Sequence, residues 1–404
     1  MGTAHPPGYP LYTLIVGAVV RLTKFPWFDG AWFGNDEAKP VYWVNVTSCV
    51  CGSIALGLIS LIVFRLTKDL DNNNPKDDEA SNTNPKCRVL SSLARAVCAV
   101  STSLMCSFSP LMWQYNKEAE VFALHNLFVS AILYVLTVYA EAVAAANVVG
   151  TTKANNEANH LTTIVIGAFL CGLSLTNQHT SILLIVPVAA FVFYQSSIFQ
   201  KPKLLLISAL SFVVGLSPYI ALPILATLHP HAGSWGDVTS FSGFIHHLLR
   251  QDYGTLRLFS GDDTASEGMV ARSGRWAYDF SFSQLCHPMV VCFLVLGVAS
   301  QLVHNLRRHS MGTSAKKKAK RARQMNRRQQ NCKPTNGAGR VIAFALFFYL
   351  AVFHSLSNLP LSNPLLFGIH QVRVRHVMYK LILLSTHNSV RCKKNRGFGC
   401  IVIF

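Results

Sequence analysis

Charged side chains are scarce in this sequence. Asp, Glu, Lys and Arg make up 13% of its 404 residues, whereas soluble globular domains carry about 25%. Apolar residues make up 51% of the chain, and the mean hydropathy is +0.33. This composition excludes an ordinary soluble domain and predicts an all-α polytopic membrane protein.

Acidic residues are absent from two strongly basic segments. Residues 306–333 hold eleven Lys and Arg residues, residues 371–396 hold seven, and neither segment holds an acid. These eighteen cations equal the formal net charge of +18, so the rest of the chain is balanced. A protein that binds nucleic acid would carry its basic residues across a folded face, and we therefore predict no nucleic-acid partner.

Motifs for metals and nucleotides are also missing. The eleven cysteines include no Cys-x-x-Cys pair and no Cys/His spacing typical of zinc sites. Most of them lie in apolar runs, where buried free thiols are expected. No glycine-rich nucleotide-binding loop is present. The neighbouring His246 and His247 lack a third ligand at a suitable spacing, so we predict no metal site.

The apolar runs predict about eight transmembrane helices and one short helix at the membrane surface. A span requires about 20 apolar residues, and the candidate runs are 43–66, 89–109, 119–140, 160–177, 180–197, 203–227, 285–304 and 339–358. Residues 11–22 are too short to cross, and aromatic and basic residues follow them, so we place them in the interface. The closely spaced runs 160–177 and 180–197 predict a tight helical hairpin.

The basic run at 306–333 predicts the orientation, because loops rich in Lys and Arg stay cytosolic. Counting crossings back from this loop places the loops that are rich in chemically active side chains on the opposite, lumenal side. The resulting organisation is a lumenal turn and interfacial helix (1–42), a helix bundle (43–227), a lumenal loop (228–284), a transmembrane helix (285–304), a basic cytosolic loop (305–338), a transmembrane helix (339–362) and an atypical basic tail (363–404).

Four lumenal segments carry the candidate site residues. A rigid proline-rich turn comes first, then a pair of carboxylates before a span, then amides and an imidazole at a helix end, and finally the 228–284 loop. The two carboxylates are two residues apart, so on a helix they would diverge and only one could face inward. The side chains concerned are His5, Tyr9, Glu118, Glu120, Gln178, His179, Trp235, Asp237, Arg250 and Arg257.

These residue types suit a sugar donor carried on a lipid phosphate. Arg250 and Arg257 are seven residues apart, hence on one face if helical, and guanidinium groups bind phosphate through paired hydrogen bonds. A carboxylate would take the proton of the acceptor hydroxyl, other groups would hold the departing phosphate, and Trp235 would stack on the sugar. Structural roles remain open as alternatives: a carboxylate that caps the next helix, a satisfied interface histidine at His179, and arginines that contact lipid headgroups.

Four motifs together resemble one family of membrane glycosyltransferases. They are Gly2-Thr3-Ala4-His5-Pro6-Pro7-Gly8-Tyr9-Pro10-Leu11, Glu118-Ala119-Glu120-Val121-Phe122-Ala123-Leu124, Gly172-Leu173-Ser174-Leu175-Thr176-Asn177-Gln178-His179-Thr180 and Trp235-Gly236-Asp237. From residue 2 to about Gln371 the chain resembles the GT-C-type family that includes the animal protein O-mannosyltransferase of the endoplasmic reticulum.

The resemblance implies a GT-C-like fold in the endoplasmic-reticulum membrane, a lumenal active site and dolichyl-phosphate mannose as the donor. It implies Ser and Thr acceptors in lumenal domains, namely the IPT domains of plexin-type receptors. The motifs and the lumenal segments together predict catalytic residues (Glu120, His5, Asp237) and donor- or phosphate-binding residues (Arg250, Arg257, His179, Gln178, Trp235, Tyr9). No metal or further cofactor is predicted.

The same resemblance places the family's catalytic base in an acidic segment before the His-Pro-Pro-Gly turn, upstream of Met1. The family pattern also stops after Gln371, so the chain is expected to be incomplete at both ends. Two other functions stay open. A solute transporter would need ionisable residues within its spans, and few are present. A catalytically inactive assembly partner would fit the expected loss of the base.

Overall fold

The computed structural model describes residues 9–24, 39–71, 85–149, 153–228, 236–251, 268–279, 282 and 337–356. Within these ranges the chain forms helices and the turns between them, with no β-strand. The prediction of an all-α chain is therefore confirmed for the described residues. His5, Trp235, Arg257 and the predicted span 285–304 lie outside them.

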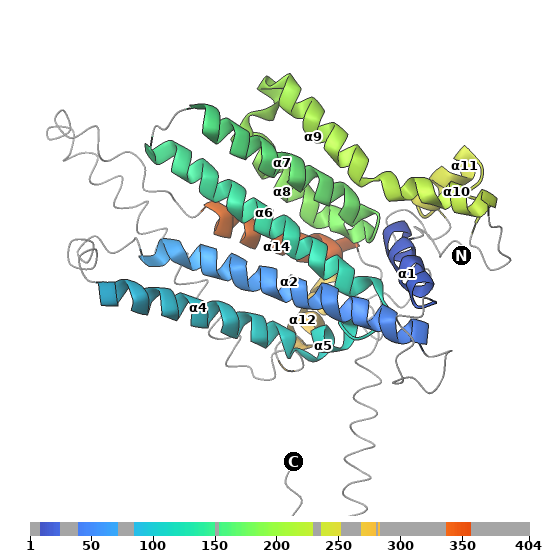
Figure 1. Cartoon of the computed structure of the whole chain (residues 1–404), viewed down its shortest axis with the longest axis horizontal. Coiled ribbons are helices and arrows are strands. Elements are labelled where there is room, and N and C mark those ends of the chain that lie inside the picture. Colours follow the sequence, from blue (N-terminus) through green and yellow to red (C-terminus); the bar gives the residue numbers. More distant parts are fainter. Residues whose placement is uncertain are drawn as a thin grey trace, which may run out of the picture.

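Within the described ranges, seven long helices form a bundle (Figure 1). They are α2 (Lys39–Asp71), α4 (Pro85–Ser107), α6 (Val121–Val149), α7 (Lys153–Leu175), α8 (Ile182–Ser196), α9 (Pro202–Gly215) and α14 (Gly337–Leu356). Shorter helices are α1 (Pro10–Leu22), α5 (Pro110–Tyr115), α10 (Ala221–Leu228), α11 (Phe241–Leu248) and α12 (Met269–Asp279), with 3-10 turns η2 (His179–Ser181), η3 (Ile198–Gln200) and η4 (Ser217–Ile220).

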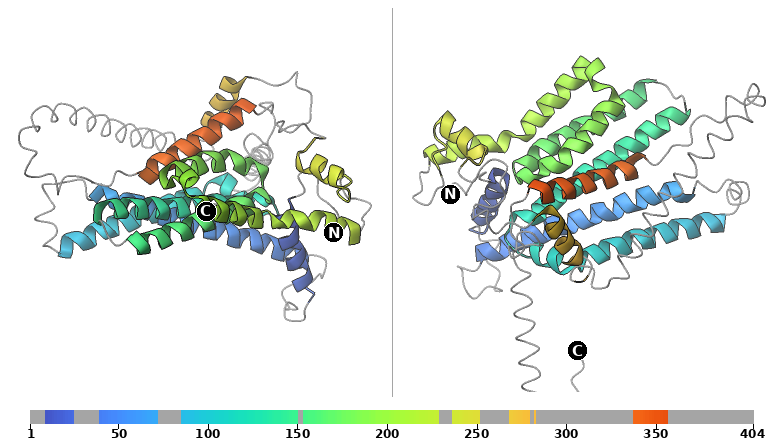
Figure 2. Two further views of the ribbon diagram at one scale, coloured as in Figure 1. Left: turned by 90° about the horizontal axis from the view of Figure 1, so that it is seen from above. Right: turned by 180° about the vertical axis from the view of Figure 1, so that it is seen from behind.

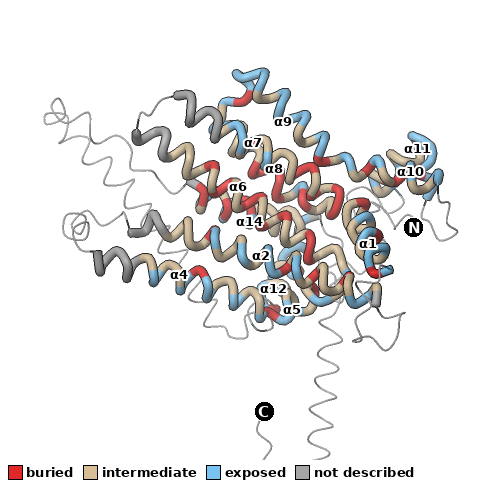
Figure 3. Tube along the Cα trace, viewed as in Figure 1, coloured by how far each residue is buried: buried red, intermediate tan, exposed pale blue. Residues whose placement is uncertain are grey.

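The long helices pack in two layers. Helices α4, α2, α6, α7 and α9 lie side by side in this order, and α8 and α14 pack together on one face of that layer (Figure 2). Buried residues gather where α6, α8 and α14 meet, among them Leu136, Leu184, Val188 and Ala345 (Figure 3). The apolar faces of these helices are thus covered by one another.

The apolar helices identify a helical membrane protein. Three of the described helices are long and apolar enough to cross a membrane, Pro40–Thr67, Val121–Ala144 and His179–Ser196, and a bent pair can form a fourth span. Large apolar side chains such as Leu206, Leu210 and Val213 are more than half exposed on α9, as expected for a surface that faces lipid. The predicted runs 89–109, 160–177 and 339–358 are helical, but their described apolar parts are shorter than a full span.

The predicted span 203–227 corresponds to the bent pair of helices, which passes as one span by length and composition but bends in the middle. Residues Pro202–Gly215 and Ser217–Leu228 meet at an angle of 43°. Pro218 has no backbone N–H to donate, and the chain forms the 3-10 turn η4 at this point. The bend turns α10 away from the bundle. Tyr219 lies on the inner side of the bend, and 8% of the Tyr219 surface is exposed.

The predicted hairpin of 160–177 and 180–197 has a tight turn, but its two helices diverge. Helix α7 packs mainly against α6 and α9, whereas α8 packs mainly against α14. At the turn a hydrogen bond of 2.8 Å joins the Ser174 and Ser181 hydroxyls. The sequence spacing thus predicted the turn, and packing against other helices separates the arms.

One end of the bundle gathers the loops that carry the described candidate residues. Helix α1, the turn before α6, the turn between α7 and α8, and helices α10 and α11 all lie at this end (Figure 1). The predicted interfacial segment 11–22 corresponds to α1, which packs across the ends of α2 and η4 instead of joining the bundle. The sequence predicts that these loops share the lumenal side of the membrane, and this stays a prediction.

The cysteines whose side chains the structure describes are free thiols: Cys49, Cys51, Cys98, Cys106 and Cys171. The prediction that such thiols are buried is confirmed only for Cys171 among them, because the others lie on helix faces that are open to the surroundings.

Candidate active site

The turn between α7 and α8 is held in place by buried polar groups. Asn177 is 1% exposed, and its side-chain nitrogen donates to the backbone carbonyl of Val121 at 3.2 Å. The Leu11 N–H donates to the Thr176 carbonyl at 3.4 Å, which ties α1 to the same turn. These two hydrogen bonds hold the backbone just before Gln178 and His179 in place.

His179 makes a hydrogen bond that determines which ring nitrogen carries the proton. Its Nε2 lies 2.5 Å from the Tyr219 hydroxyl oxygen, and that hydroxyl donates to the Leu175 carbonyl at 2.9 Å. A phenol has one proton, and a carbonyl can only accept. Nε2 of His179 must therefore be the donor to Tyr219. The neutral ring keeps its lone pair at Nδ1, which makes no hydrogen bond within the described ranges.

Helix α11 and the turn after it bring an imidazole, His247, and a guanidinium, Arg250, near His179. His247 on this helix is 2% exposed, and both His247 and Arg250 lie close enough to act electrostatically on the His179 ring. Tyr9, at the start of α1, acts in the same way on Tyr219. We call this group of five residues, His179, Tyr219, His247, Arg250 and Tyr9, the imidazole cluster.

Arg250 has an unusual backbone conformation. Its φ is 54°, in the left-handed region, and its N–H donates to the His247 carbonyl at 3.1 Å just after α11 ends. Glycine is the usual residue at this position after a helix, and an L-residue there costs about 1–2 kcal/mol. Arg250 therefore lies outside α11, so the helical condition under which it would share one face with Arg257 is not met at Arg250. A long cationic side chain nevertheless occupies a position that favours glycine.

Asp237 organises the segment that leads into α11. Its carboxylate accepts hydrogen bonds from the Thr239 hydroxyl at 2.5 Å and the Thr239 N–H at 3.0 Å, with the Ser240 hydroxyl at 3.5 Å. The Thr239 bonds hold the pKa of Asp237 below its usual value. This contribution to stability is complete above the pKa of the unfolded chain and is lost as the pH falls through the folded value. Asp237 is thus ionised at neutral pH.

Glu120 lies in a second polar group at the same end of the bundle. A small cavity of about 10 Å³ is lined by Glu120, Tyr12, Ser48 and Cys51, among others. Burial, followed by the negative charge of Glu120, raises the pKa of Tyr12 to about 12. The Tyr12 phenol therefore stays protonated at physiological pH and can donate a hydrogen bond. We call these four residues the carboxylate pocket.

Glu118 and Glu120 diverge, as predicted, although they lie in a turn instead of a helix. Glu118 accepts a hydrogen bond of 3.0 Å from the Gln114 side chain, whereas Glu120 faces the carboxylate pocket. The backbone folds between them, since the Glu120 N–H donates to the Glu118 carbonyl at 2.8 Å.

The imidazole cluster and the carboxylate pocket are joined through α1 and Asn177. Tyr9 at the start of α1 belongs to the cluster, and Tyr12, one turn later, lines the pocket. Asn177 comes two residues before His179 of the cluster, and its side chain donates to the backbone carbonyl of Val121. Val121 directly follows Glu120 of the pocket. The two groups thus share one scaffold.

Three residues of the imidazole cluster and the carboxylate pocket were not predicted from the sequence as site residues. Tyr219 lies in an apolar run that predicted a plain span, Tyr12 in an apolar interfacial run, and His247 was considered only as a metal ligand beside His246. Within the described ranges, no three His, Cys, Asp or Glu side chains converge on a possible metal position. The proline in Ser217-Pro218-Tyr219 was the one available signal that this span bends.

The Tyr219 hydroxyl is expected to stabilise this end of the protein. In Tyr219→Phe the Leu175 carbonyl and the His179 Nε2–H both lose a buried partner, which should lower the free energy of unfolding by about 2 kcal/mol. Thermal unfolding of the purified protein in detergent measures the change. Tyr194→Phe is the matched control, because Tyr194 is 83% exposed. Equal melting temperatures for the two variants would contradict the assigned hydrogen bonds.

Comparison with known proteins identifies the family. Residues 1–202 match the family model described as the protein O-mannosyl-transferase TMEM260 N-terminal domain. The chain belongs to this family. It is 28% identical over 401 residues to protein O-mannosyl-transferase tmem260 of Dictyostelium discoideum, covering 98% of this chain and 40% of that protein. It is 34% identical over 278 residues to protein O-mannosyl-transferase TMEM260 of Mus musculus, covering 68% of this chain and 32% of that protein.

The chain therefore spans well under half the length of these two TMEM260 relatives. No solved structure matches it. The range that matches the TMEM260 family model includes Tyr9, Glu120, Gln178 and His179. Arg250 lies beyond the last matched residue. The imidazole cluster is thus assembled from inside and outside the matched domain.

Proposed function

We propose that this chain forms part of a GT-C-like mannosyltransferase of the endoplasmic-reticulum membrane. In this proposal mannose passes from dolichyl-phosphate mannose to Ser or Thr of lumenal domains, namely IPT domains of plexin-type receptors. Two relatives that are named protein O-mannosyl-transferases support sugar transfer to a protein, and the donor and acceptor follow from the resemblance. The observation that carries the proposal is the convergence of His179, Gln178 and Arg250 at one end of an apolar bundle.

The described groups suit a donor whose prenyl chain lies in the bilayer. The guanidinium of Arg250 can bind a phosphate through paired hydrogen bonds, and a bound anion favours the protonated form of a nearby imidazole. Nδ1–H of His179 would then donate to a phosphate oxygen. The buried Gln178 side-chain oxygen makes no hydrogen bond within the described ranges, and it can accept one from a sugar hydroxyl.

Transfer requires the bond from the sugar C1 to the phosphate oxygen to break while the acceptor oxygen bonds to C1. Both electrons of the broken bond stay on the phosphate, where Arg250 and His179 stabilise the added charge. The acceptor hydroxyl must give its proton to a base. The resemblance places that base before His5, and it assigns Glu120 and Asp237 to the lining of the site.

We further propose that the end of the bundle with the imidazole cluster faces the lumen. The basic run at 306–333 supports this orientation. The order of domains and the complement of about eight spans predicted from the sequence belong to the same proposal. His5, Trp235 and Arg257 are assigned to the site on sequence grounds alone.

The transporter alternative gains no support from the described spans. Arg65 and Glu141, which lie near one end of α2 and α6, form an ion pair of 2.6 Å. Both residues lie close to the end of their span, and not in its middle, where an ionisable residue would mark a solute pathway. An inactive assembly partner is distinguished by assay: it would bind receptor domains without transferring mannose to them.

Arg250→Gly separates the cost of the backbone conformation from the use of the side chain. Glycine adopts a positive φ readily, so the variant should be as stable as the wild type or more so. Loss of the guanidinium should nevertheless reduce mannose transfer by about 10²-fold. The measurement is transfer of labelled mannose from dolichyl-phosphate mannose to a purified IPT domain, together with the melting temperature.

Arg250→Lys is the companion variant, since it keeps a positive charge but loses the paired geometry. A wild-type rate in Arg250→Gly would overturn the phosphate assignment. If the mouse TMEM260 relative transfers mannose under conditions in which this chain does not, the chain itself is inactive, and binding of the chain to the IPT domain then tests the assembly-partner alternative.

A further inference from the structure

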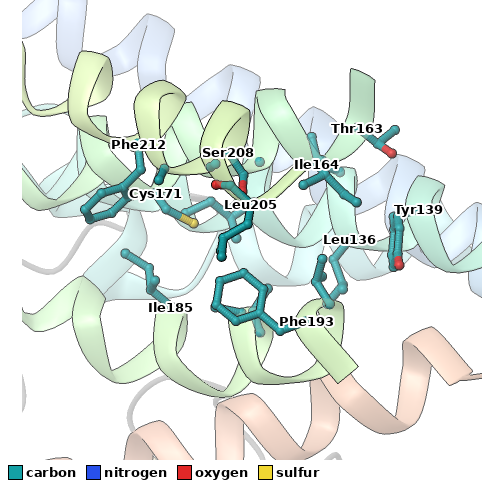
Figure 4. A pocket seen from close by; sticks show the side chains of 18 residues that line it. Leu136, Tyr139, Thr163, Ile164, Cys171, Ile185, Phe193, Leu205, Ser208 and Phe212 are labelled. Atoms are coloured by element: carbon teal, nitrogen blue, oxygen red, sulfur yellow. The ribbon is translucent and has the colours of Figure 1, made fainter. Parts of the chain in front are cut away.

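An apolar cavity of about 340 Å³ lies between α6, α7, α8 and α9 (Figure 4). It occupies the space left by the divergence of α7 and α8. Its walls include Leu136, Cys171, Ile185, Phe193 and Phe212. The volume falls in the range of about 300–1,000 Å³ that is usual for small-ligand sites.

The walls offer an occupant almost no free hydrogen-bonding groups. The Thr163 hydroxyl donates to the His160 carbonyl at 3.0 Å, and the Ser208 hydroxyl donates to the Leu204 carbonyl at 2.9 Å. Both hydroxyls are thus used by their own helices. An occupant must therefore be bound by apolar contact, which indicates a hydrocarbon chain.

The cavity reaches a part of the surface that faces lipid. Ala209 lines the cavity and is exposed on α9. Helices α8 and α9 each pack mainly against other helices, so the gap between them is not closed by tight packing. The neighbouring Leu206 and Leu210 are more than half exposed on the same helix. A chain from the bilayer can thus enter from the side.

Cations mark the end of the cavity away from the imidazole cluster. Thr163 lines the cavity, His160 lies one turn before it, and Lys201 acts electrostatically on His160. Lys201 is also one turn before the lining residue Leu205, and both Lys201 and Lys203 are exposed. The length of α8, about 22 Å for its 15 residues, separates these lysines from His179.

We infer that this cavity binds one acyl chain of a membrane phospholipid, whose phosphate lies beside Lys201 and Lys203. The occupant is distinct from the sugar donor, because the donor phosphate belongs at the opposite end of the bundle. The bound chain fills the space between α7, α8 and α9 and so supports the helices that carry His179 and Tyr219. Exposed lysines at this end attract anionic headgroups.

Filling the cavity tests the inference. Ala189 on α8 and Ala209 on α9 both line it, so Ala189→Phe and Ala209→Phe should each lower the phospholipid that remains bound after purification in mild detergent by about tenfold. Native mass spectrometry and lipid extraction measure the bound lipid. Val186→Phe is the matched control, because Val186 is 49% exposed on α8 and does not line the cavity.

A second measurement uses the delipidated protein. Phosphatidylglycerol added to detergent micelles should raise the melting temperature of the wild type and of Val186→Phe, but not that of Ala189→Phe. Lys201→Ala with Lys203→Ala should remove the preference for phosphatidylglycerol over phosphatidylcholine. Arg340→Ala, an exposed cation on α14, should retain it.

Each outcome decides the matter. Loss of phospholipid from both cavity variants with retention in Val186→Phe supports the site. Equal phospholipid content in all variants, or a wild type without bound lipid, overturns it. Loss of a polyprenyl lipid in place of a phospholipid would overturn the assigned occupant. Mannose transfer is not part of this test, so the proposed activity can fail while the lipid site holds.

Discussion

His179→Gln is expected to reduce mannose transfer by about 10³-fold, the upper range for the loss of one hydrogen-bond donor to charge that develops in the reaction. The glutamine side-chain nitrogen can replace Nε2 as the donor to Tyr219, so the buried hydrogen bond of 2.5 Å can be retained. The variant lacks Nδ1, and with it the donor to the phosphate oxygen that the protonated ring provides. The rate constant should therefore fall while the melting temperature changes little.

The control for this experiment is His246→Gln. His246 neighbours His247 on α11 but is exposed, so its replacement should leave transfer within about threefold of the wild-type rate, less than 1 kcal/mol. Transfer of labelled mannose to a purified IPT domain is measured for both variants. If His179→Gln transfers mannose as fast as His246→Gln does, the imidazole takes no part in the reaction.

Gly172→Leu is expected to prevent the correct packing of α7 against α9. A Cβ atom at Gly172 would collide with the Phe212 carbonyl oxygen and would lie within 3.1 Å of the Gly215 backbone. A backbone cannot move aside as a flexible side chain can, so we expect a loss of at least about 3 kcal/mol in the free energy of unfolding. Size-exclusion elution and thermal unfolding in detergent measure the effect.

Gly57→Leu is the matched control, because a Cβ atom at Gly57 on α2 meets nothing within 4 Å. This variant should elute and melt like the wild type. Normal folding of Gly172→Leu would show that α7 and α9 do not cross closely, and the description of the cavity beside them would fail as well.

The sequence predicted most of the described helices because each depends on a local property. A run of about 20 apolar residues has one favourable conformation in a bilayer, and α2, α6 and α8 follow from their composition. The bend at Pro218 and the divergence of α7 from α8 were not predicted. The bend has a local signal in Pro218, which the apolar run around it obscured. The divergence depends on which neighbour each helix packs against, and no window of a single sequence contains that information.

The candidate site was predicted in part for the same reason. Gln178 and His179 stand out as polar residues between two apolar runs, and Glu120 precedes another. Tyr219 resembles any aromatic residue of a span until the bend brings its hydroxyl to His179. Arg250 and Arg257 were expected to share one face only if their segment is helical, and the positive φ of Arg250 shows that this residue follows the helix.

Composition by itself determined that this chain is a helical membrane protein, and the residue pattern predicted that its candidate site residues lie between the apolar runs. Hydropathy is a sum over neighbouring residues, so it can be read without knowing the fold. Only the tertiary structure decided that His179 is oriented by Tyr219, 40 residues further along the chain, and that a cavity separates α7 from α8. Both features arise from contacts between distant segments, and the geometry of such contacts is set when the helices pack.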